Sequence, residues 1–120
     1  MGDFKQLKAW QQAHELVRDL HAAFSGHHHG GYPGLRAQIL RAAASIPLNL
    51  AEGCAKRSRR ELARFAEMAY ASAKEVECEL MLSRDVKLIP RQTYDKLARK
   101  TDDVARLCYG LTRVSPSTPK

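Results

Sequence analysis

The stretch that decides the fold is Ser58–Val86, which reads SRRELARFAEMAYASAKEVECELMLSRDV. It opens with a Ser-x-x-Glu capping box, in which the serine hydroxyl accepts a hydrogen bond from a free N–H at the start of a helix. No glycine or proline follows within the stretch. Apolar residues recur at alternating spacings of four and three, the seam of a helix packed in a bundle. This seam consists of Leu62, Ala66, Ala69, Ala73, Val76 and Leu80.

Comparable apolar stripes predict three more helices. The expected helices span residues 8–25, 33–54, 58–87 and 91–114, and a frayed tail follows at 115–120. The stripe of the first helix is Trp10, Ala13, Val17, Leu20 and Phe24. Short connections between helices make sequential helices antiparallel neighbours. We therefore expect an all-α, antiparallel, up-down-up-down four-helix bundle that forms a single domain over residues 1–120.

One residue interrupts the second expected helix. Pro47 lies well inside it. A proline there removes one backbone hydrogen bond and bends most helices. We therefore expect a kink at Pro47.

Composition places the chain among soluble globular proteins. Its 120 residues are 44% hydrophobic and 28% charged, and no apolar run approaches the length of a membrane span. The first residues do not resemble a signal peptide. Cys54, Cys78 and Cys108 are widely spaced and form no CxxC pair. We expect a cytoplasmic protein with buried, reduced thiols, and a disulfide or metal centre is the alternative.

The third expected helix carries a second apolar face. Because neighbouring residues are 100° apart around a helix, several apolar side chains lie away from the seam. They are Tyr70, Ala71, Cys78, Met81 and Leu82. A helix that is apolar nearly all round favours burial on two sides, so these residues are candidates for a subunit interface. The alternative is a set of scattered exposed apolar residues.

Two polar residues fall close to the expected core. Asn49 lies in the apolar stripe of the second helix, and Glu77 lies beside the seam of the third. A buried carboxylate needs partners. We expect Glu77 to be buried in a hydrogen-bond network with Asn49 that sets the helix register. A catalytic role for Glu77 is the alternative.

A basic cluster lies at the expected turn between the second and third helices. Its members are Lys56, Arg57, Arg59, Arg60 and Arg64, and Arg41 on the second helix adds to them. The net charge is +7, which favours acidic partners. Arginines at a helix N-terminus suit phosphate, because guanidinium groups and free N–H groups both donate to it. The cluster therefore predicts contact with RNA or DNA, and a solvated charged turn is the alternative.

No arrangement of residues in the chain is typical of an active site. His27, His28 and His29 are adjacent in a glycine-rich stretch, but they lack the spacing of a zinc site. The chain also lacks the phosphate-loop, dinucleotide-binding and hydrolase motifs. We expect no enzymatic activity, no cofactor, no metal and no small-molecule substrate. A nuclease that uses the histidine run or Glu77 is the alternative.

Four segments together resemble a known family. FKQLKAWQQAHEL (Phe4–Leu16) is similar to its opening F-x-x-L-x-x-W-Q-x-A-H-E-L, and RAAASIPLNLAEG (Arg41–Gly53) to its hallmark R-A-A-x-S-I-P-x-N-I-A-E-G. SRRELARF (Ser58–Phe65) and AKEVECEL (Ala73–Leu80) resemble its two later motifs. The family comprises bacterial four-helix-bundle proteins encoded in intervening sequences of 23S ribosomal RNA genes, also called S23-ribosomal-protein-like.

The resemblance implies an assembly and a partner. It implies a homo-oligomeric ring, a pentamer, and kinship with the accessory variability protein of diversity-generating retroelements, which works with a reverse transcriptase and nucleic acid. It also implies no established enzymatic activity. We expect a homo-oligomer that binds RNA through its basic turn. The alternative is a scaffold that binds another protein, with incidental basicity.

Overall fold

The described residues form helices and no strands. The computed structural model describes residues 2–25 and 33–113. A short 3-10 helix, η1 (Phe4–Gln6), precedes four α-helices, which are α1 (Lys8–Phe24), α2 (Pro33–Cys54), α3 (Arg59–Asp85) and α4 (Arg91–Thr112). Each α-helix begins and ends within two residues of its expected range. The expected all-α class is confirmed, and the expected tail at 115–120 lies outside the described residues.

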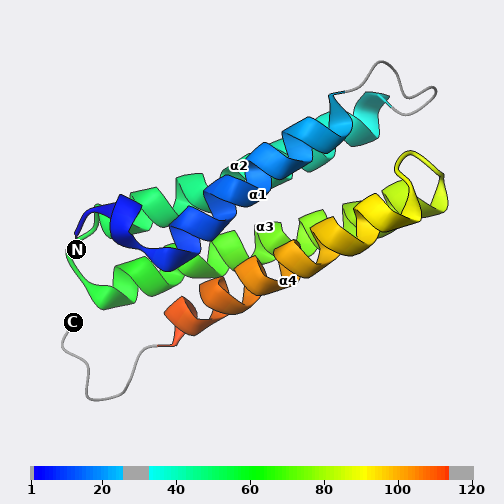
Figure 1. The fold of residues 1–120 in the computed structure, drawn as a ribbon. Coiled ribbons are helices and arrows are strands. Elements are labelled where there is room, and N and C mark those ends of the chain that lie inside the picture. The colour runs from blue at the N-terminus through cyan, green and yellow to red at the C-terminus, as the bar shows by residue number, and fades with distance from the viewer. Residues whose placement is uncertain (1, 26–32, 114–120) are drawn as a thin grey trace.

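The four α-helices form an antiparallel bundle (Figure 1). Helix α1 packs against α2 and α4, and α3 packs against the same two helices. The bundle is elongated, with extents of 51 × 20 × 20 Å. The start of α1, the α2–α3 turn and the last turn of α4 lie at one end, and the α3–α4 turn lies at the other (Figure 1). Groups on the two turns are therefore separated by most of the length of the molecule.

The core runs the length of the bundle along the predicted seams. All six members of the α3 seam are buried. They meet fully buried residues of the other helices, which are Leu16, Leu20 and Phe24 of α1, Ile39, Ile46 and Leu50 of α2, and Val104 and Cys108 of α4. Alanines at three seam positions of α3 leave room for these larger side chains, because complementary sizes fill a helix interface.

The predicted stripe of α1 is wrong at two positions. Ala9, Ala13, Leu16, Leu20 and Phe24 are the buried residues of this helix. Trp10 and Val17, which the spacing placed in the stripe, are only half-buried against the edge of the core. Apolar residues cover a wide part of the α1 surface. Because α1 packs against both α2 and α4, the part that is buried includes Leu16 and leaves Trp10 and Val17 at its edge.

Helix α2 continues through Pro47, which is buried. Proline has no N–H group, so the carbonyl of Ala43 has no partner four residues later. The kink that this loss favours stays a prediction.

The outer faces of the helices are largely polar. Lys100 of α4 forms ion pairs with Glu15 and Asp19 of α1, which links the first helix to the last. Between residues 2–25 and 33–113, no helix is long and apolar enough to cross a membrane.

Candidate nucleic-acid interface

The α2–α3 turn is built by a helix end and a capped helix start. The N–H of Lys56 donates to the carbonyl of Gly53 over 3.1 Å, which closes the end of α2. Ser58 is extended, with φ −128° and ψ 156°, and its hydroxyl accepts from the N–H of Glu61 over 3.1 Å. The predicted capping box therefore supplies the N-cap of α3.

Gly53 lets the two helices approach closely at this turn. A Cβ atom at this position would lie 2.9 Å from the Cβ of Phe65 and 3.0 Å from a methyl group of Leu62. Any side chain here would push the first turns of α3 away from α2. The glycine therefore sets the distance between the end of α2 and the arginines on α3.

The structure brings five of the six basic candidates together. Arg57, Arg59, Arg60 and Arg64 are exposed. The Lys56 ammonium and the Arg64 guanidinium each lie 5.2 Å from the centre of the Phe65 ring. We call these five residues the basic turn. In the part of the chain that the structure describes, no carboxylate forms an ion pair with any of its four arginines.

A shallow cavity of about 470 Å³ lies beside the basic turn. Arg60 and Arg64 line it together with Thr112 from the last turn of α4. Glu61 and Glu67 also line it and reduce its net positive charge.

Arg41 is not part of this cluster. It is exposed on α2, thirteen residues before the end of the helix. A rise of 1.5 Å per residue places it about 20 Å along the axis from the turn. Arg41 therefore lies apart from the basic turn, because the residues between them form continuous helix. Its contact with nucleic acid stays a prediction.

The interface candidates on α3 divide into two groups. Ala71, Cys78 and Leu82 are exposed on one line of the helix, and Met81 is exposed to one side of it. Tyr70 is half-buried and packs on Tyr109 of α4, with ring centres 5.6 Å apart. Tyr70 therefore covers the contact between α3 and α4, and the others remain candidates for a subunit interface.

The pattern analysis missed three exposed apolar side chains. Leu48 on α2 is 66% exposed, Met68 on α3 is 40% exposed and Tyr109 on α4 is 52% exposed. Leu48 directly follows the buried Pro47, and its outward position breaks the polar pattern of the outer face of α2.

The predicted buried network is wrong for Glu77. This residue is exposed, and its carboxylate accepts a hydrogen bond from Lys74 over 3.0 Å. Asn49 is partly buried and donates instead to the carbonyl of Ser45 over 2.8 Å. The hydroxyls of Ser45 and Ser72 share a hydrogen bond of 2.5 Å, which joins α2 to α3. The network therefore runs from Asn49 to Ser72 without a carboxylate.

The buried carboxylate of α3 belongs to Glu79. This residue is 7% exposed, and its Oε1 atom has no hydrogen-bond partner among the described residues. The buried arc of α3 is centred towards α2, where Phe65 and Ser83 are also buried. Position 79 falls on that side of the helix and position 77 on the other. Burial, and then the nearby Glu75 carboxylate, raise the pKa of Glu79 to about 7.

Across residues 2–25 and 33–113 none of the three thiols is part of a disulfide, and the three differ in exposure. Cys54 and Cys108 are buried as expected, whereas the expectation of burial is wrong for Cys78, which is exposed on α3. Burial raises the pKa of Cys108 to about 12 and also raises that of Cys54. The two buried thiols are therefore protonated and unreactive at neutral pH.

The histidine run at 27–29 lies outside the described residues. Across the two described ranges, no group of three or more His, Cys, Asp or Glu side chains is placed to hold a metal ion.

The fold and the exposed arginines place this chain in the class of antiparallel four-helix-bundle proteins, with a basic turn at one end of the bundle. The model of the 23S rRNA-intervening sequence protein family matches residues 5–110, so the chain belongs to that family. A similar fold occurs in the crystal structure of a protein with unknown function from the S23 ribosomal protein family of Bacteroides thetaiotaomicron, with 19% identity and a TM-score of 0.76. The match covers 88% of this chain and 96% of that one. No curated protein matches the chain.

Proposed function

We propose that this protein is a non-enzymatic, homo-oligomeric member of its family, a pentameric ring, which binds RNA through the basic turn. The observation that carries the proposal is the basic turn itself. Four exposed arginines lie within eight residues at the start of α3, and none of them is engaged by a carboxylate within residues 2–25 and 33–113. Their charge is therefore available to an external anion.

The surroundings of the arginines suit a phosphate backbone. A guanidinium group donates two parallel hydrogen bonds to phosphate oxygens. The N-terminus of α3 adds a partial positive charge. The Phe65 ring, which two basic groups flank, is itself 8% exposed. It therefore supports the cations and offers little surface on which a base could stack.

Assembly would multiply these contacts. In a ring of identical subunits the basic turn repeats once per subunit, so one RNA molecule would meet several copies. The exposed apolar residues of α3 support such an assembly, because Leu82 and Met81 are 48% and 43% exposed in the single subunit.

The test is a titration of a structured RNA hairpin, followed by fluorescence anisotropy at 50 mM and 200 mM salt. If each subunit contacts about four phosphates, affinity should fall about a hundredfold between the two salt concentrations. The variant Arg59→Glu/Arg60→Glu should lower affinity at least tenfold at low salt and reduce the salt slope by about two.

A charge-matched control separates the basic turn from net charge. Lys96 and Arg99 are exposed on α4, away from the basic turn, and Lys96→Glu/Arg99→Glu changes the net charge equally. This variant should retain most of the affinity. Equal losses in the two variants would refute the basic turn as the site. Unchanged affinity in both would favour the scaffold alternative, with a protein partner.

A further inference from the structure

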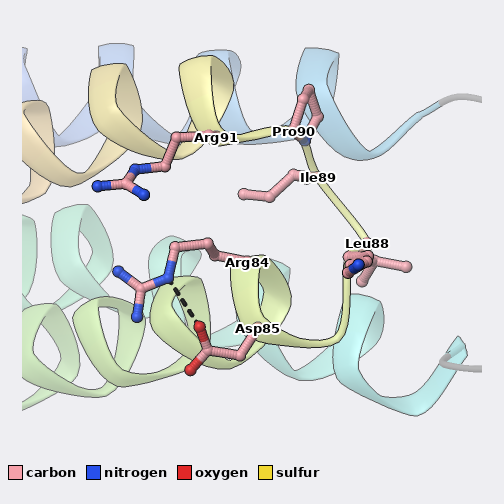
Figure 2. Close-up of a pocket in the computed structure, with 7 residues that line it drawn as sticks. Arg84, Asp85, Leu88, Ile89, Pro90 and Arg91 are labelled. Carbon is pink, nitrogen blue, oxygen red and sulfur yellow. Dashed lines mark hydrogen bonds and ion pairs between the residues drawn. The ribbon is translucent and has the colours of Figure 1, made fainter.

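A second cationic cavity lies at the opposite end of the bundle, at the α3–α4 turn (Figure 2). Its volume is about 670 Å³, within the usual range of about 300–1,000 Å³ for small-molecule sites. Its lining residues are Arg84, Asp85, Lys87, Leu88, Ile89, Pro90 and Arg91. Three of them are basic and one is acidic.

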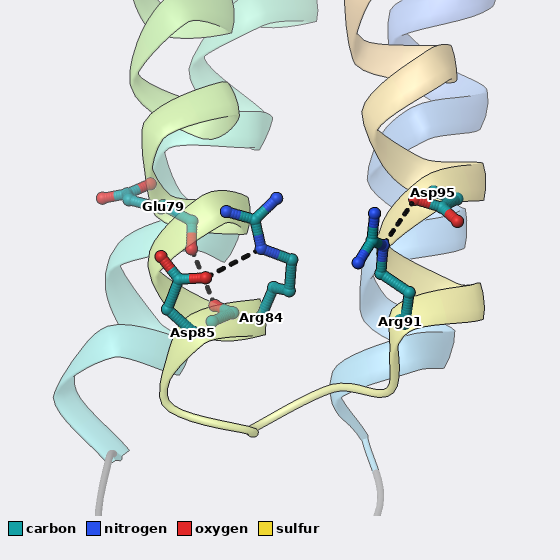
Figure 3. A network of polar contacts seen from close by, with 6 residues as sticks. Glu79, Arg84, Asp85, Arg91 and Asp95 are labelled. Atoms are coloured by element: carbon teal, nitrogen blue, oxygen red, sulfur yellow. Dashed lines mark hydrogen bonds and ion pairs between the residues drawn. The ribbon is translucent and has the colours of Figure 1, made fainter.

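The two arginines come from different helices and face the same gap. Arg84 ends α3 and Arg91 begins α4, and Figures 2 and 3 show their guanidinium groups on facing sides of the gap between these helices. Arg84 is held in place by Asp85, over 2.8 Å, and by the Tyr94 ring, whose centre is 4.5 Å away. Arg91 pairs with Asp95 over 3.3 Å.

Both arginines retain donors for a ligand. In each pair the hydrogen bond to the carboxylate comes from Nε. Among the described residues, the terminal nitrogens of the two guanidinium groups have no hydrogen-bond acceptor. These nitrogens are the donors that bind phosphate oxygens in parallel pairs.

Lys87 occupies a position that normally requires glycine. Its φ is 63°, in the left-handed region, and it is the only described residue other than glycine with a positive φ. Its N–H donates to the carbonyl of Arg84, and the N–H of Leu88 donates to that of Ser83. These two bonds form a Schellman motif, in which glycine is the usual residue at the left-handed position. A lysine is disfavoured in the left-handed region. A Schellman motif with a lysine side chain at this position is therefore unusual.

The remaining walls are largely apolar. Leu88 and Ile89 are 8% and 5% exposed, so they close the floor of the cavity against the core. Pro90 precedes α4 and has no side-chain acceptor for the first N–H groups of that helix. The floor therefore excludes water from one side, and the open side is surrounded by positive charge.

We propose that this cavity binds a small phosphate-bearing anion through Arg84, Lys87 and Arg91. Three cations that line one cavity, from the end of one helix, a left-handed turn and the start of the next, match the several oxygens of a phosphate or diphosphate group. This site is separate from the basic turn and lies about one bundle length from it. It does not depend on the proposed RNA binding.

The test uses inorganic pyrophosphate as the probe, in isothermal titration calorimetry at constant ionic strength. The wild-type protein should bind it saturably, with one site per subunit. Lys87→Gly should raise the thermal unfolding midpoint without ligand, because glycine relieves the left-handed position, and should lower pyrophosphate affinity at least tenfold. Lys87→Asn, which tolerates the same backbone conformation, should lose affinity similarly.

Two further variants make the result decisive. Lys87→Arg keeps the charge and should stay within about threefold of the wild-type affinity. Arg59→Glu/Arg60→Glu, at the other end of the bundle, should bind pyrophosphate as the wild-type protein does. No saturable binding, or wild-type affinity in Lys87→Gly, would overturn the proposal. Pyrophosphate binding that is lost only in the Arg59/Arg60 variant would also overturn it and would assign the anion to the basic turn.

Competition distinguishes two sources of the phosphate group. In the Arg59→Glu/Arg60→Glu background, displacement of pyrophosphate by a mononucleotide would support a free small ligand. Displacement only by a 5′-phosphorylated RNA oligonucleotide would support capture of an RNA end at the same three residues.

Discussion

At the scale of single residues, Glu79 is the group whose environment least suits it. Its side chain is buried on the side of α3 away from Arg84 and α4 (Figure 3). No described cation pairs with it, and Glu75 lies one helical turn earlier. Since its pKa is raised to about 7 in the folded protein, the folded state binds a proton more tightly than the unfolded chain does. The stabilisation from this proton is complete below the unfolded pKa of about 4.5 and is lost as pH rises through 7.

Glu79→Gln should therefore stabilise the protein at pH 8 and have little effect at pH 4. A tenfold change in proton affinity corresponds to about 1.4 kcal/mol, so a pKa raised from 4.5 to about 7 predicts a gain of about 3 kcal/mol at pH 8. Urea denaturation at the two pH values and one protein concentration measures it.

The control for this prediction is Glu77→Gln, two positions away on the exposed side of the helix. It removes only the surface pair with Lys74, so its effect should stay within about 0.5 kcal/mol at both pH values. A Glu79→Gln variant that is destabilised at pH 8 would show that the ionised carboxylate has a favourable partner.

At the scale of elements, α3 depends on its start. The Ser58 hydroxyl satisfies the N–H of Glu61, and the acidic side chain of Glu61 in the first turn suits the positive end of the helix. This cap matters beyond stability, because the first two turns of α3 carry Arg59, Arg60 and Arg64.

Ser58→Ala should cost about 1 kcal/mol of folding free energy, the usual loss for an N-cap serine. Urea denaturation measures the loss. Ser25→Ala is the matched comparison, since the Ser25 hydroxyl lies at the end of α1 and donates to the carbonyl of Ala22 on an exposed surface. Its effect should stay within about 0.5 kcal/mol. Equal losses would show that the Ser58 hydrogen bond adds nothing specific to α3.

At the scale of the whole molecule, the surface is uneven in charge and in apolarity. The arginines of the basic turn occupy one end of α3, and Glu75, Glu77 and Glu79 lie in its second half. Exposed apolar side chains of α3 lie between these regions, at Met68, and beyond the glutamates, at Met81 and Leu82. Ring assembly would cover these side chains and leave the basic ends of the subunits free.

Leu82→Glu should therefore lower the molar mass in solution. Light scattering at micromolar concentration should give about five times the 13.5 kDa chain mass for the wild-type protein and a smaller multiple for the variant, because a buried charge without a partner opposes association.

Leu48→Glu is the matched control, since Leu48 is an equally large apolar residue exposed on α2. It should leave the mass unchanged. If Leu48→Glu dissociates the assembly and Leu82→Glu does not, the interface lies on α2. A monomeric wild-type protein would contradict the proposed ring.

The sequence alone determined the helices and the seam of α3. Capping residues, prolines and the four-three spacing act over a few neighbouring residues, so Ser58, Pro90 and the stripe from Leu62 to Leu80 could be interpreted without tertiary information. The basic turn could also be predicted, because its residues are contiguous along the chain.

Only the tertiary structure decided which side of each helix is buried and which distant groups meet. Spacing sets the angles within one helix, but packing against two neighbours sets its rotation. Helix α3 is rotated slightly towards α2 relative to the orientation that its spacing predicts, so Glu79 is buried and Glu77 is exposed. Helix α1 is rotated in a similar way, so Leu16 is buried and Trp10 and Val17 are only half-buried. The placement of Arg84, Lys87 and Arg91 around one cavity likewise depends on the left-handed backbone of Lys87, a conformation that no local pattern in the sequence indicates for a lysine.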